Sequence, residues 1–417
     1  MRQLLLLTYT FPPDNMAAAA RPGHLFEYLP ERGYQPIVIA SSNECSLGVE
    51  NLVYRVPTER EPAGIKQLSK FTKWLMRYGA PYHDRLAWAP HATYAGTRLI
   101  RSQKISAVYS TSPFLASHLS ALWLKTRFGL PWIADFQDPI RDNPMRNRKW
   151  IYPYDALIEE IIFRRADRVI ANTDTVAAAW RQRYPQWAPK ISVLWNSFDP
   201  RDNIDISRPP ERRYKVLAHV GSLYGQRAPT LVLSSLQRLG ISSSRLRVRL
   251  VGPIDSNVLD RHRALFERMR QNGVLEYEAR LIPGEEARQE MGEADYLLVL
   301  DLNDSNASFQ LPSKLVEYIR FGKPILAYTA SGSPVERILE KSGIAYVAVD
   351  PAKPEAVRDK KVLEFLDFST ATRSPSPWFE ETFSAKTEAR TVADLLDNLL
   401  PPKNPSDAGT ARIAPAV

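Results

Sequence analysis

The residues best suited to chemistry lie in the segment 310–326, which reads QLPSKLVEYIRFGKPIL. Pro312 is typical of a helix start, so the backbone N–H groups of residues 313–315 are expected to lack partners within the helix. A helix N-terminus with a lysine beside it, here Lys314, can hold a phosphate group. Glu317 follows one turn later on the same face, where its carboxylate could accept both hydroxyls of a ribose. The segment therefore predicts a phosphate site with a ribose contact.

A second interpretation of this segment stays open. Glu317 could instead pair with Lys314 and Arg320 on the helix surface, and each such pair stabilises a helix by about 0.2–0.5 kcal/mol. The spacing of the three residues fits both interpretations.

A glycine loop earlier in the same half is another candidate anion site. The apolar strand expected over 215–220 is followed by Gly221 and Ser222, and the loop continues to Arg227. Glycine lets a backbone approach an anion closely, and arginine can neutralise the charge. The sequence has neither the Gly-x-Gly-x-x-Gly fingerprint nor a Walker lysine motif after a strand. A tight turn with a solvated arginine therefore also explains the loop.

Two carboxylates and a histidine are candidates in the first half. Asp138 comes just after the apolar strand expected over 132–136, where it could orient a hydroxyl group or stabilise a developing positive charge. Asp135, nearer the strand, is expected to bond local backbone. His118 lies on an apolar helix over 115–128 and is most simply a packed or capping histidine.

The elements that must position these residues follow from the hydrophobic pattern. Short apolar runs alternate with helix-length amphipathic segments, which is typical of parallel sheets covered by helices. The expected strands are 4–8, 36–40, 105–110, 132–136, 168–172, 190–195, 215–220, 246–251, 277–282, 296–300, 325–328 and 345–349. The expected helices include 115–128, 156–166, 229–239, 257–271, 312–321 and 385–400. We expect two doubly wound α/β lobes, with ligands bound beyond the carboxyl ends of the strands.

The lobe boundaries are expected where this pattern breaks. Residues 1–197 form a first lobe, 198–213 lack apolar periodicity and form a linker, and 214–376 form a second lobe. A last helix over 377–400 is expected to cross back to the first lobe, and 401–417 to form a disordered tail.

Composition limits the class of protein. The 417 residues are 44% hydrophobic and 24% charged, which is typical of a folded chain with two domains. One cysteine excludes a disulfide framework and a cysteine-rich zinc site. The apolar run after Met1 is too short for a signal peptide, and no stretch reaches the ~20 apolar residues that span a bilayer. We therefore expect a cytoplasmic protein.

The net charge of +9 is concentrated in one segment, because residues 60–104 hold nine basic and two acidic residues. Within Ile65–Tyr78, basic residues recur at helical spacing and apolar residues occupy the other faces. Such a helix could lie on an anionic membrane surface. A solvated basic face, or a helix packed on its own lobe, would have the same pattern. Nucleic-acid binding is not expected, because the segment contains no recognised module.

Short motifs occur in order along the chain: Phe11-Pro12-Pro13-Asp14, Ser112-Pro113 with His118, Pro131–Pro139, Ala166-Asp167, Asn196–Asp199, Val220–Tyr224 and Pro312–Tyr318. Together they resemble bacterial glycosyltransferase family 4 enzymes over most of residues 1–400. The resemblance implies the GT-B fold, in which two Rossmann-like lobes face each other across a cleft.

The resemblance also implies a role for each lobe. The second lobe would bind a nucleotide-sugar donor through Gly221, Ser222, Arg227, Ser313, Lys314, Leu315 and Glu317. The first lobe would bind the acceptor through Asp14, His118 and Asp138. Asp138, Arg227 and Lys314 are the expected catalytic residues.

Two positions depart from the family pattern. Phe309 stands where many members have a glutamate that contacts the transferred sugar, and Gln137 stands where close relatives often have arginine. Asp301, Asp304 or Gln310 could replace the glutamate, or the contact is missing.

The resemblance therefore implies a retaining hexosyl- or N-acetylhexosaminyltransferase that acts on a glycolipid or polysaccharide in the synthesis of lipopolysaccharide, capsule or a related cell-surface glycan. Cations at the diphosphate would stabilise the leaving group, so we expect no metal and no other cofactor. The expected location is the cytoplasm, at the inner face of the membrane. Two alternatives stay open: a nucleotide-sugar epimerase of the same fold, and a non-catalytic binding protein, which Phe309 makes credible.

Overall fold

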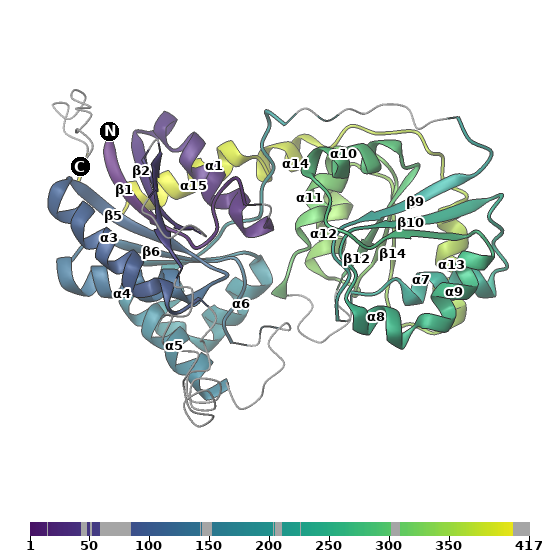
Figure 1. Ribbon diagram of the computed structural model, residues 1–417, viewed down its shortest axis with the longest axis horizontal. Coiled ribbons are helices and arrows are strands. Elements are labelled where there is room, and N and C mark those ends of the chain that lie inside the picture. Colours follow the sequence, from purple (N-terminus) through teal and green to yellow (C-terminus); the bar gives the residue numbers. More distant parts are fainter. Residues whose placement is uncertain are drawn as a thin grey trace. The chain divides into compact units, whose positions relative to one another are not determined.

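The computed structural model describes residues 1–14, 16–42, 48–50, 52–58, 85–141, 143, 152–202, 204, 211–225, 227–301 and 309–402. The chain divides into two compact units: the first is Met1–Trp195 together with the chain from Ala385 onward, and the second is Asn196–Ser384. Each unit is a sheet with helices on both faces (Figure 1).

The first unit has eight described strands in the order β3-β4-β2-β1-β5-β6-β7-β8. Neighbouring strands are parallel, apart from the antiparallel pair β3 and β4. The strands are β1 (Arg2–Leu7), β2 (Tyr34–Ser42), β3 (Gly48–Glu50), β4 (Val53–Pro57), β5 (Ile105–Thr111), β6 (Trp132–Phe136), β7 (Arg168–Ala171) and β8 (Ile191–Val193).

Helices from both ends of the chain cover this sheet. They are α1 (Ala20–Tyr28), α3 (Trp88–Ser102), α4 (Leu115–Phe128), α5 (Tyr152–Arg165), α6 (Asp174–Arg183) and α15 (Ala385–Asp397). Helices α1 and α15 lie side by side (Figure 1). Side chains of α15 such as Val392 and Leu396 are buried in one cluster with Leu25 of α1 and Leu4 of β1. The C-terminal helix therefore belongs to the core of the first unit, as the sequence predicted.

The second unit has six described strands, all parallel, in the order β11-β10-β9-β12-β13-β14. The strands are β9 (Lys215–Val220), β10 (Leu246–Val251), β11 (Leu275–Glu278), β12 (Tyr296–Leu300), β13 (Ile325–Tyr328) and β14 (Tyr346–Val349). The helices are α7 (Thr230–Arg238), α8 (Ser256–Arg261), α9 (Arg263–Gln271), α10 (Gly284–Glu293), α11 (Ser313–Arg320), α12 (Pro334–Ser342), α13 (Glu355–Leu366) and α14 (Pro377–Thr382).

Local sequence signals set the ends of these elements. In α12, the Ser333 side chain accepts a hydrogen bond from the Glu336 amide, and Pro334 occupies the first turn. The helix ends at Gly343, whose φ of 81° suits a residue without a side chain. Strand β12 reads YLLVL and is buried along its whole length, as expected for a central parallel strand.

The order of the second sheet reverses between β9 and β12. From β9 the chain continues outward to β10 and β11, whereas from β12 it continues outward to β13 and β14. Loops that leave two such adjacent strands diverge, and ligands of open α/β sheets bind at the space between them. The loop after β9 starts at Gly221, so this candidate residue lies at the reversal.

The expected α/β fold is confirmed, and several boundaries differ from those expected. The second unit begins at Asn196 and ends at Ser384, so residues 196 and 197 belong to it and not to the first lobe. The expected final helix 377–400 is two helices: α14 belongs to the second unit and α15 to the first. The expected helix 257–271 is interrupted at His262, between α8 and α9.

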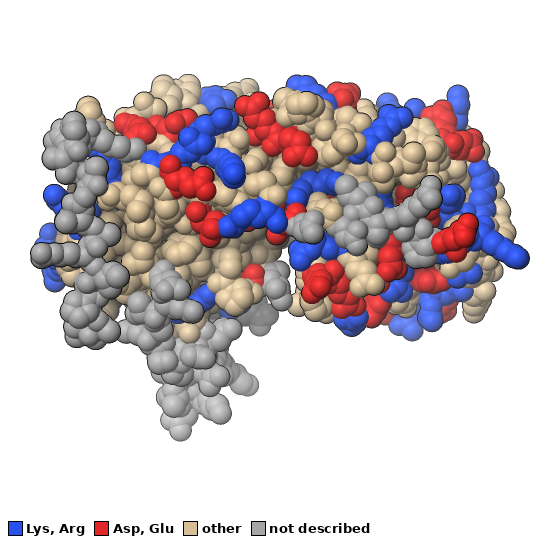
Figure 2. Space-filling view, turned by 90° about the horizontal axis from the view of Figure 1, so that it is seen from above, with Lys and Arg blue, Asp and Glu red and all other residues tan. Residues whose placement is uncertain are grey.

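Parts of three expectations lie outside the described residues: the basic helix Ile65–Tyr78, much of the linker 198–213 and the tail 403–417. Across the described chain, every helix is too short or too polar to cross a bilayer. Figure 2 shows Lys and Arg interspersed with Asp and Glu on the face of the second unit that it views. This mixture agrees with the near balance of charge in the second half of the sequence.

Candidate functional site

The centre of the candidate site is the contact between the loop after β9 and the start of α11. The phenol oxygen of Tyr318 accepts a hydrogen bond from the Val220 amide (2.7 Å) and donates one to the Val220 carbonyl (3.2 Å). Both residues are buried. This pair of bonds attaches α11 to the end of β9, one residue before Gly221.

Lys314 lies beside Gly221 as a result. A Cβ atom added to Gly221 would stand 3.6 Å from Cγ of Lys314 and 3.5 Å from Nε2 of His219. The space where a side chain of residue 221 would begin is therefore bordered by a lysine and a histidine. The structure brings together three residues that the sequence places on different elements.

A second glycine holds the loop in place. A Cβ atom on Gly252, which has a φ of 134°, would overlap the carbonyl oxygen of Gly221. Because residue 252 has no side chain, the loops after β9 and β10 approach closely. The Gly221 amide then donates to the Val251 carbonyl (2.8 Å), and the Leu223 amide donates to the Pro253 carbonyl (2.9 Å).

Lys314 and Glu317 form an ion pair with an Nζ–Oε2 distance of 2.6 Å. Their side chains are 35% and 41% exposed, so this pair contributes at most about 1 kcal/mol to stability. Arg320 does not join this ion pair. Its guanidinium lies over the Phe198 ring at 4.4 Å and donates a hydrogen bond to the Asp202 carbonyl. The structure therefore contains the surface ion pair between Glu317 and Lys314, and it also places Lys314 beside Gly221, as a phosphate site would require.

The start of α11 is only partly open. The amides of Ser313 and Lys314 have no hydrogen-bond partner among the residues that the structure describes. The Leu315 amide donates to the Pro312 carbonyl (3.0 Å), and the Leu315 side chain is fully buried. The expectation that Leu315 offers a free amide is therefore wrong, because the turn at Pro312 uses it.

Arg227 is held at the other end of the loop. Its Nη1 donates to the Tyr224 hydroxyl (2.8 Å), and its guanidinium lies 5.5 Å from the centre of the same ring. Ser222, between Gly221 and Tyr224, is exposed. The arginine therefore has a local partner and is not simply solvated.

His219 is the buried base of this site. Its Nδ1 lies 2.9 Å from the Leu298 carbonyl of β12, and its side chain is 6% exposed. Burial lowers the pKa of His219 to about 4; the bond to Leu298 opposes this change, and the positive charges of Arg227 and Lys314 add to it. The ring is therefore neutral at pH 7.

Three residues were proposed to replace the glutamate that is missing at position 309, and the structure describes two of them. Asp301 directly follows β12 and is buried, and it accepts a hydrogen bond from the Thr329 hydroxyl (2.8 Å). Gln310 is buried, and Phe309 is partly buried. Asp304 lies outside the described residues.

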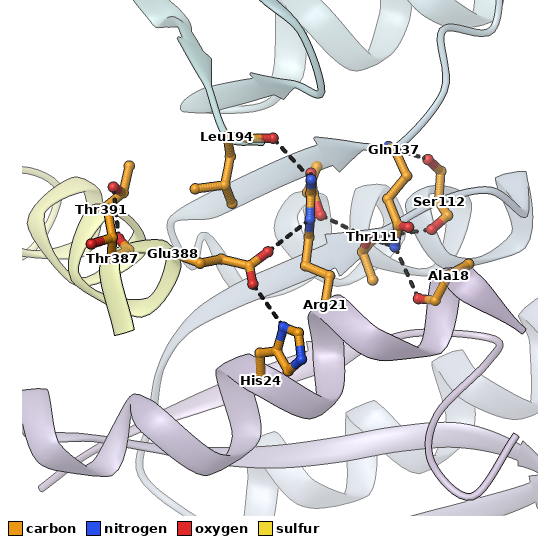
Figure 3. Close-up of polar contacts among 11 residues, drawn as sticks. Ala18, Arg21, His24, Thr111, Ser112, Gln137, Leu194, Thr387, Glu388 and Thr391 are labelled. Carbon is orange, nitrogen blue, oxygen red and sulfur yellow. Dashed lines mark hydrogen bonds and ion pairs between the residues drawn. The ribbon is translucent and has the colours of Figure 1, made fainter. Parts of the chain in front are cut away.

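The first unit contains a buried ionic cluster at the carboxyl end of β6 (Figure 3). Arg21 of α1 contacts Asp135 of β6 (2.6 Å) and Glu388 of α15 (2.9 Å), and it donates to the Leu194 carbonyl (2.8 Å). Nδ1 of His24 lies 3.2 Å from Glu388. The expectation that Asp135 bonds local backbone is wrong: its carboxylate pairs with Arg21 and accepts from Thr111.

Burial dominates the electrostatics of this cluster. It raises the pKa of Asp135, and the Arg21 guanidinium opposes that change. Arg21, Asp135 and Glu388 are each at most 2% exposed, so they cannot contact a substrate from outside the core. The cluster fixes α1, β6 and α15 together.

Gln137 and Asp138 lie in the loop that follows β6, next to this cluster. The side-chain Nε2 of Gln137 donates to the Ala18 carbonyl (3.0 Å) and to the Thr111 hydroxyl (3.1 Å), as Figure 3 shows. Asp138, the next residue, is partly buried and lies beyond the carboxyl end of β6. Its contact with a ligand stays a prediction.

The other two acceptor candidates have structural partners. Asp14 is exposed, and its carboxylate accepts a hydrogen bond from the Phe11 amide (3.1 Å) within its own turn. His118 is fully buried, with Nδ1 2.8 Å from the Ser110 hydroxyl and its ring against Phe136. The expected acceptor role of His118 is therefore corrected to a role in the core. No group of three or more metal-ligating side chains occurs in the described ranges.

With this geometry in place, the chain can be compared with known proteins. Residues 17–196 match the glycosyl transferase 4-like domain family. None of the curated proteins matches the sequence. The two parallel sheets with their helices are the two Rossmann-like lobes of the GT-B fold.

Solved structures share this fold at low sequence identity. The sucrose-phosphate synthase of Thermosynechococcus elongatus is 12% identical, with a TM-score of 0.69 over 96% of this chain and 99% of that chain. HepE of Anabaena in complex with UDP-glucose is 13% identical, with a TM-score of 0.59 over 95% and 100%. The UDP-GlcNAc 2-epimerase of Methanocaldococcus jannaschii is 11% identical, with a TM-score of 0.56 over 95% and 99%.

Proposed function

We propose that the protein is a metal-independent retaining glycosyltransferase that uses a nucleotide-sugar donor. The observation that carries this proposal is the convergence of Gly221, His219 and Lys314 where the second sheet reverses. A diphosphate here would meet a close backbone, two amides at the start of α11 and a lysine. HepE binds UDP-glucose and the epimerase is named for UDP-GlcNAc, which supports a nucleotide-sugar for this fold.

The cations of the site supply the proposed catalysis. When the anomeric bond breaks, negative charge grows on the diphosphate, and Lys314 and Arg227 stabilise it more in the transition state than in the ground state. Lys314 would exchange Glu317 for the diphosphate, because their ion pair is partly exposed. Glu317 would then be available to the ribose hydroxyls. These cations take the role that a divalent metal has in other transferases.

The first lobe is the proposed acceptor side. Asp138 would orient an acceptor hydroxyl, and Asp14 would contact the acceptor from the loop after β1. The departing phosphate oxygen would take the acceptor proton on the same face of the sugar, which gives retention. We propose a glycolipid or polysaccharide acceptor of the cell surface, a hexosyl or N-acetylhexosaminyl group, and a peripheral position on the inner membrane face through Ile65–Tyr78.

The test is incubation of the full chain with a panel of nucleotide-sugars, with and without lipid-linked acceptors. Transfer that persists in excess EDTA supports the proposal. Conversion of a nucleotide-sugar without an acceptor would identify an epimerase, the second enzyme of this fold. Binding of a donor without transfer to any acceptor would identify a binding protein.

A further inference from the structure

One ring nitrogen of His219 has no hydrogen-bond partner among the residues that the structure describes. Nδ1 lies 2.9 Å from the Leu298 carbonyl, and because a carbonyl only accepts, Nδ1 must carry the hydrogen. Nε2 is buried and has no hydrogen-bond partner within the described part of the chain. A buried polar atom without a partner is unfavourable and rare in folded proteins.

The unused nitrogen points to the anion site. The position that a Gly221 side chain would take is 3.5 Å from Nε2 of His219 and 3.6 Å from Cγ of Lys314. A ligand oxygen that approaches the Gly221 backbone therefore enters the space bordered by both residues. The partner that Nε2 lacks would be supplied by the ligand.

We propose that His219 takes up a proton from solvent when the donor binds, and that its Nε2–H then donates a hydrogen bond to the diphosphate. This inference rests on the proposed function, because it requires a diphosphate beside Gly221 and Lys314. It assigns a binding role to His219 in addition to its hydrogen bond with Leu298.

The charges around His219 explain why protonation would depend on the ligand. Among the described residues, the charged groups that act on it are Lys314 of α11 and Arg227 of the loop, and both are positive. The neighbouring strands contribute the Leu298 carbonyl from β12 and the apolar Leu250 opposite His219 on β10. The free protein therefore favours the neutral ring. Opposite charge within ~4–6 Å moves a pKa by about 1–3 units, so a bound diphosphate would favour the imidazolium.

The direct test is NMR of the full chain with ¹³C-labelled histidine, titrated in pH with and without ligand. The probes are UDP, ADP, GDP, CDP and inorganic pyrophosphate. We expect the titration midpoint of His219 to rise from about 4 to about 7 with the bound diphosphate, which is the upper end of the effect of a nearby opposite charge. His118 of the first unit serves as the internal control and should keep its midpoint.

The variant His219→Asn distinguishes the contribution of Nδ1 from that of Nε2. An asparagine amide can replace the Nδ1 bond to Leu298 but cannot replace Nε2. We expect this variant to unfold near the wild-type temperature. Its affinity for the nucleoside diphosphate should equal that of the wild type at pH 8 and be about tenfold weaker at pH 6, where one charge-assisted bond is lost. Because the wild type and the variant are measured with the same ligand at each pH, protonation of the ligand itself affects both affinities equally.

The outcomes distinguish this inference from the proposed function. If a nucleoside diphosphate binds but the midpoint of His219 does not move, the inference is wrong and the proposed function is unaffected. Equal affinities of the wild type and His219→Asn for the nucleoside diphosphate at pH 6 would also contradict the inference and leave the proposed function unaffected. If no probe binds the wild-type chain, the diphosphate site itself is wrong and the inference fails with it.

Discussion

Tyr318 is hydrogen-bonded to both backbone groups of Val220, at 2.7 Å to the amide and 3.2 Å to the carbonyl. The bonds join the middle of α11 to the last residue of β9. Because Gly221 is the next residue, these bonds help to fix the distance between the glycine loop and Lys314.

Replacement of Tyr318 by phenylalanine should therefore affect both stability and binding. The variant leaves a buried backbone amide without its partner, which costs about 1–3 kcal/mol of unfolding free energy. We expect weaker binding of nucleotide-sugar in addition, because the start of α11 is no longer fixed. The control is Tyr296→Phe, which removes a hydroxyl bonded to the Phe368 carbonyl in the same unit. If both variants bind donor equally, Tyr318 does not position the site.

Gly252 is expected to be irreplaceable by alanine. Its φ of 134° is disfavoured for any side chain, and the added Cβ would overlap Gly221. We expect a loss of roughly 3 kcal/mol or more in unfolding free energy, measured by urea denaturation. Gly240→Ala is the matched control, because Gly240 also has positive φ (61°) but nothing within 4 Å of an added Cβ. That variant should lose only about 1–2 kcal/mol. Equal losses would contradict a role for the close approach of the two loops.

The sequence predicted the elements of this site better than their contacts. Strand 215–220 and the helix start at Pro312 follow from apolar runs and proline, which are local signals. The Tyr318 bonds and the overlap at Gly252 join residues far apart in the chain, so no local pattern contains them. The glycine at position 252, directly after an apolar strand, was the only available hint.

The buried cluster should be sensitive to loss of charge. Glu388→Gln leaves Arg21 with one carboxylate in place of two, and we expect a loss of about 3 kcal/mol in unfolding free energy of the first unit. Glu160→Gln is the control, because Glu160 pairs with Arg164 on the surface, where the side chains are 46% and 64% exposed. It should change stability by less than about 1 kcal/mol. A similar small effect of Glu388→Gln would mean that α15 is held by apolar packing alone.

His118 should make the first unit sensitive to acid. Burial lowers its pKa to about 3, whereas the unfolded chain titrates near the ordinary value of 6.5. Below pH 6.5 the unfolded state therefore binds a proton that the folded state does not, and stability falls as pH falls towards 3. Between pH 7.5 and 5.5 this amounts to about 1.4 kcal/mol.

The variant His118→Asn isolates this effect, because its amide can still bond Ser110. We expect the difference in unfolding free energy between pH 7.5 and 5.5 to be about 1.4 kcal/mol smaller in the variant than in the wild type. The same pH dependence in both proteins would show that His118 is not buried as a neutral ring.

The first unit also shows why acceptor residues are harder to predict. Asp135 and Asp138 are three residues apart, yet one is buried against Arg21 and the other lies in the loop. Asp135 is bonded by Arg21 of α1 and Thr111 of β5, and Arg21 is paired in turn with Glu388 of α15, near the other end of the chain. Nothing in the sequence around Glu388 marks this carboxylate as buried. Burial of charge depends on which distant helices pack together, which the hydrophobic pattern of one segment does not contain.

The most direct test of the donor site compares two lysines in similar local settings. Lys314 and Lys361 each pair with a glutamate three residues later in the second unit, at 2.6 and 3.1 Å, but only Lys314 lies beside Gly221. Thermal unfolding is measured with a saturating nucleotide-sugar, which stabilises a binding protein by mass action. We predict that Lys361→Ala keeps the ligand-induced rise in Tm and that Lys314→Ala loses most of it, with at least about tenfold weaker affinity. An equal rise in both variants would contradict the assignment of the diphosphate to the start of α11.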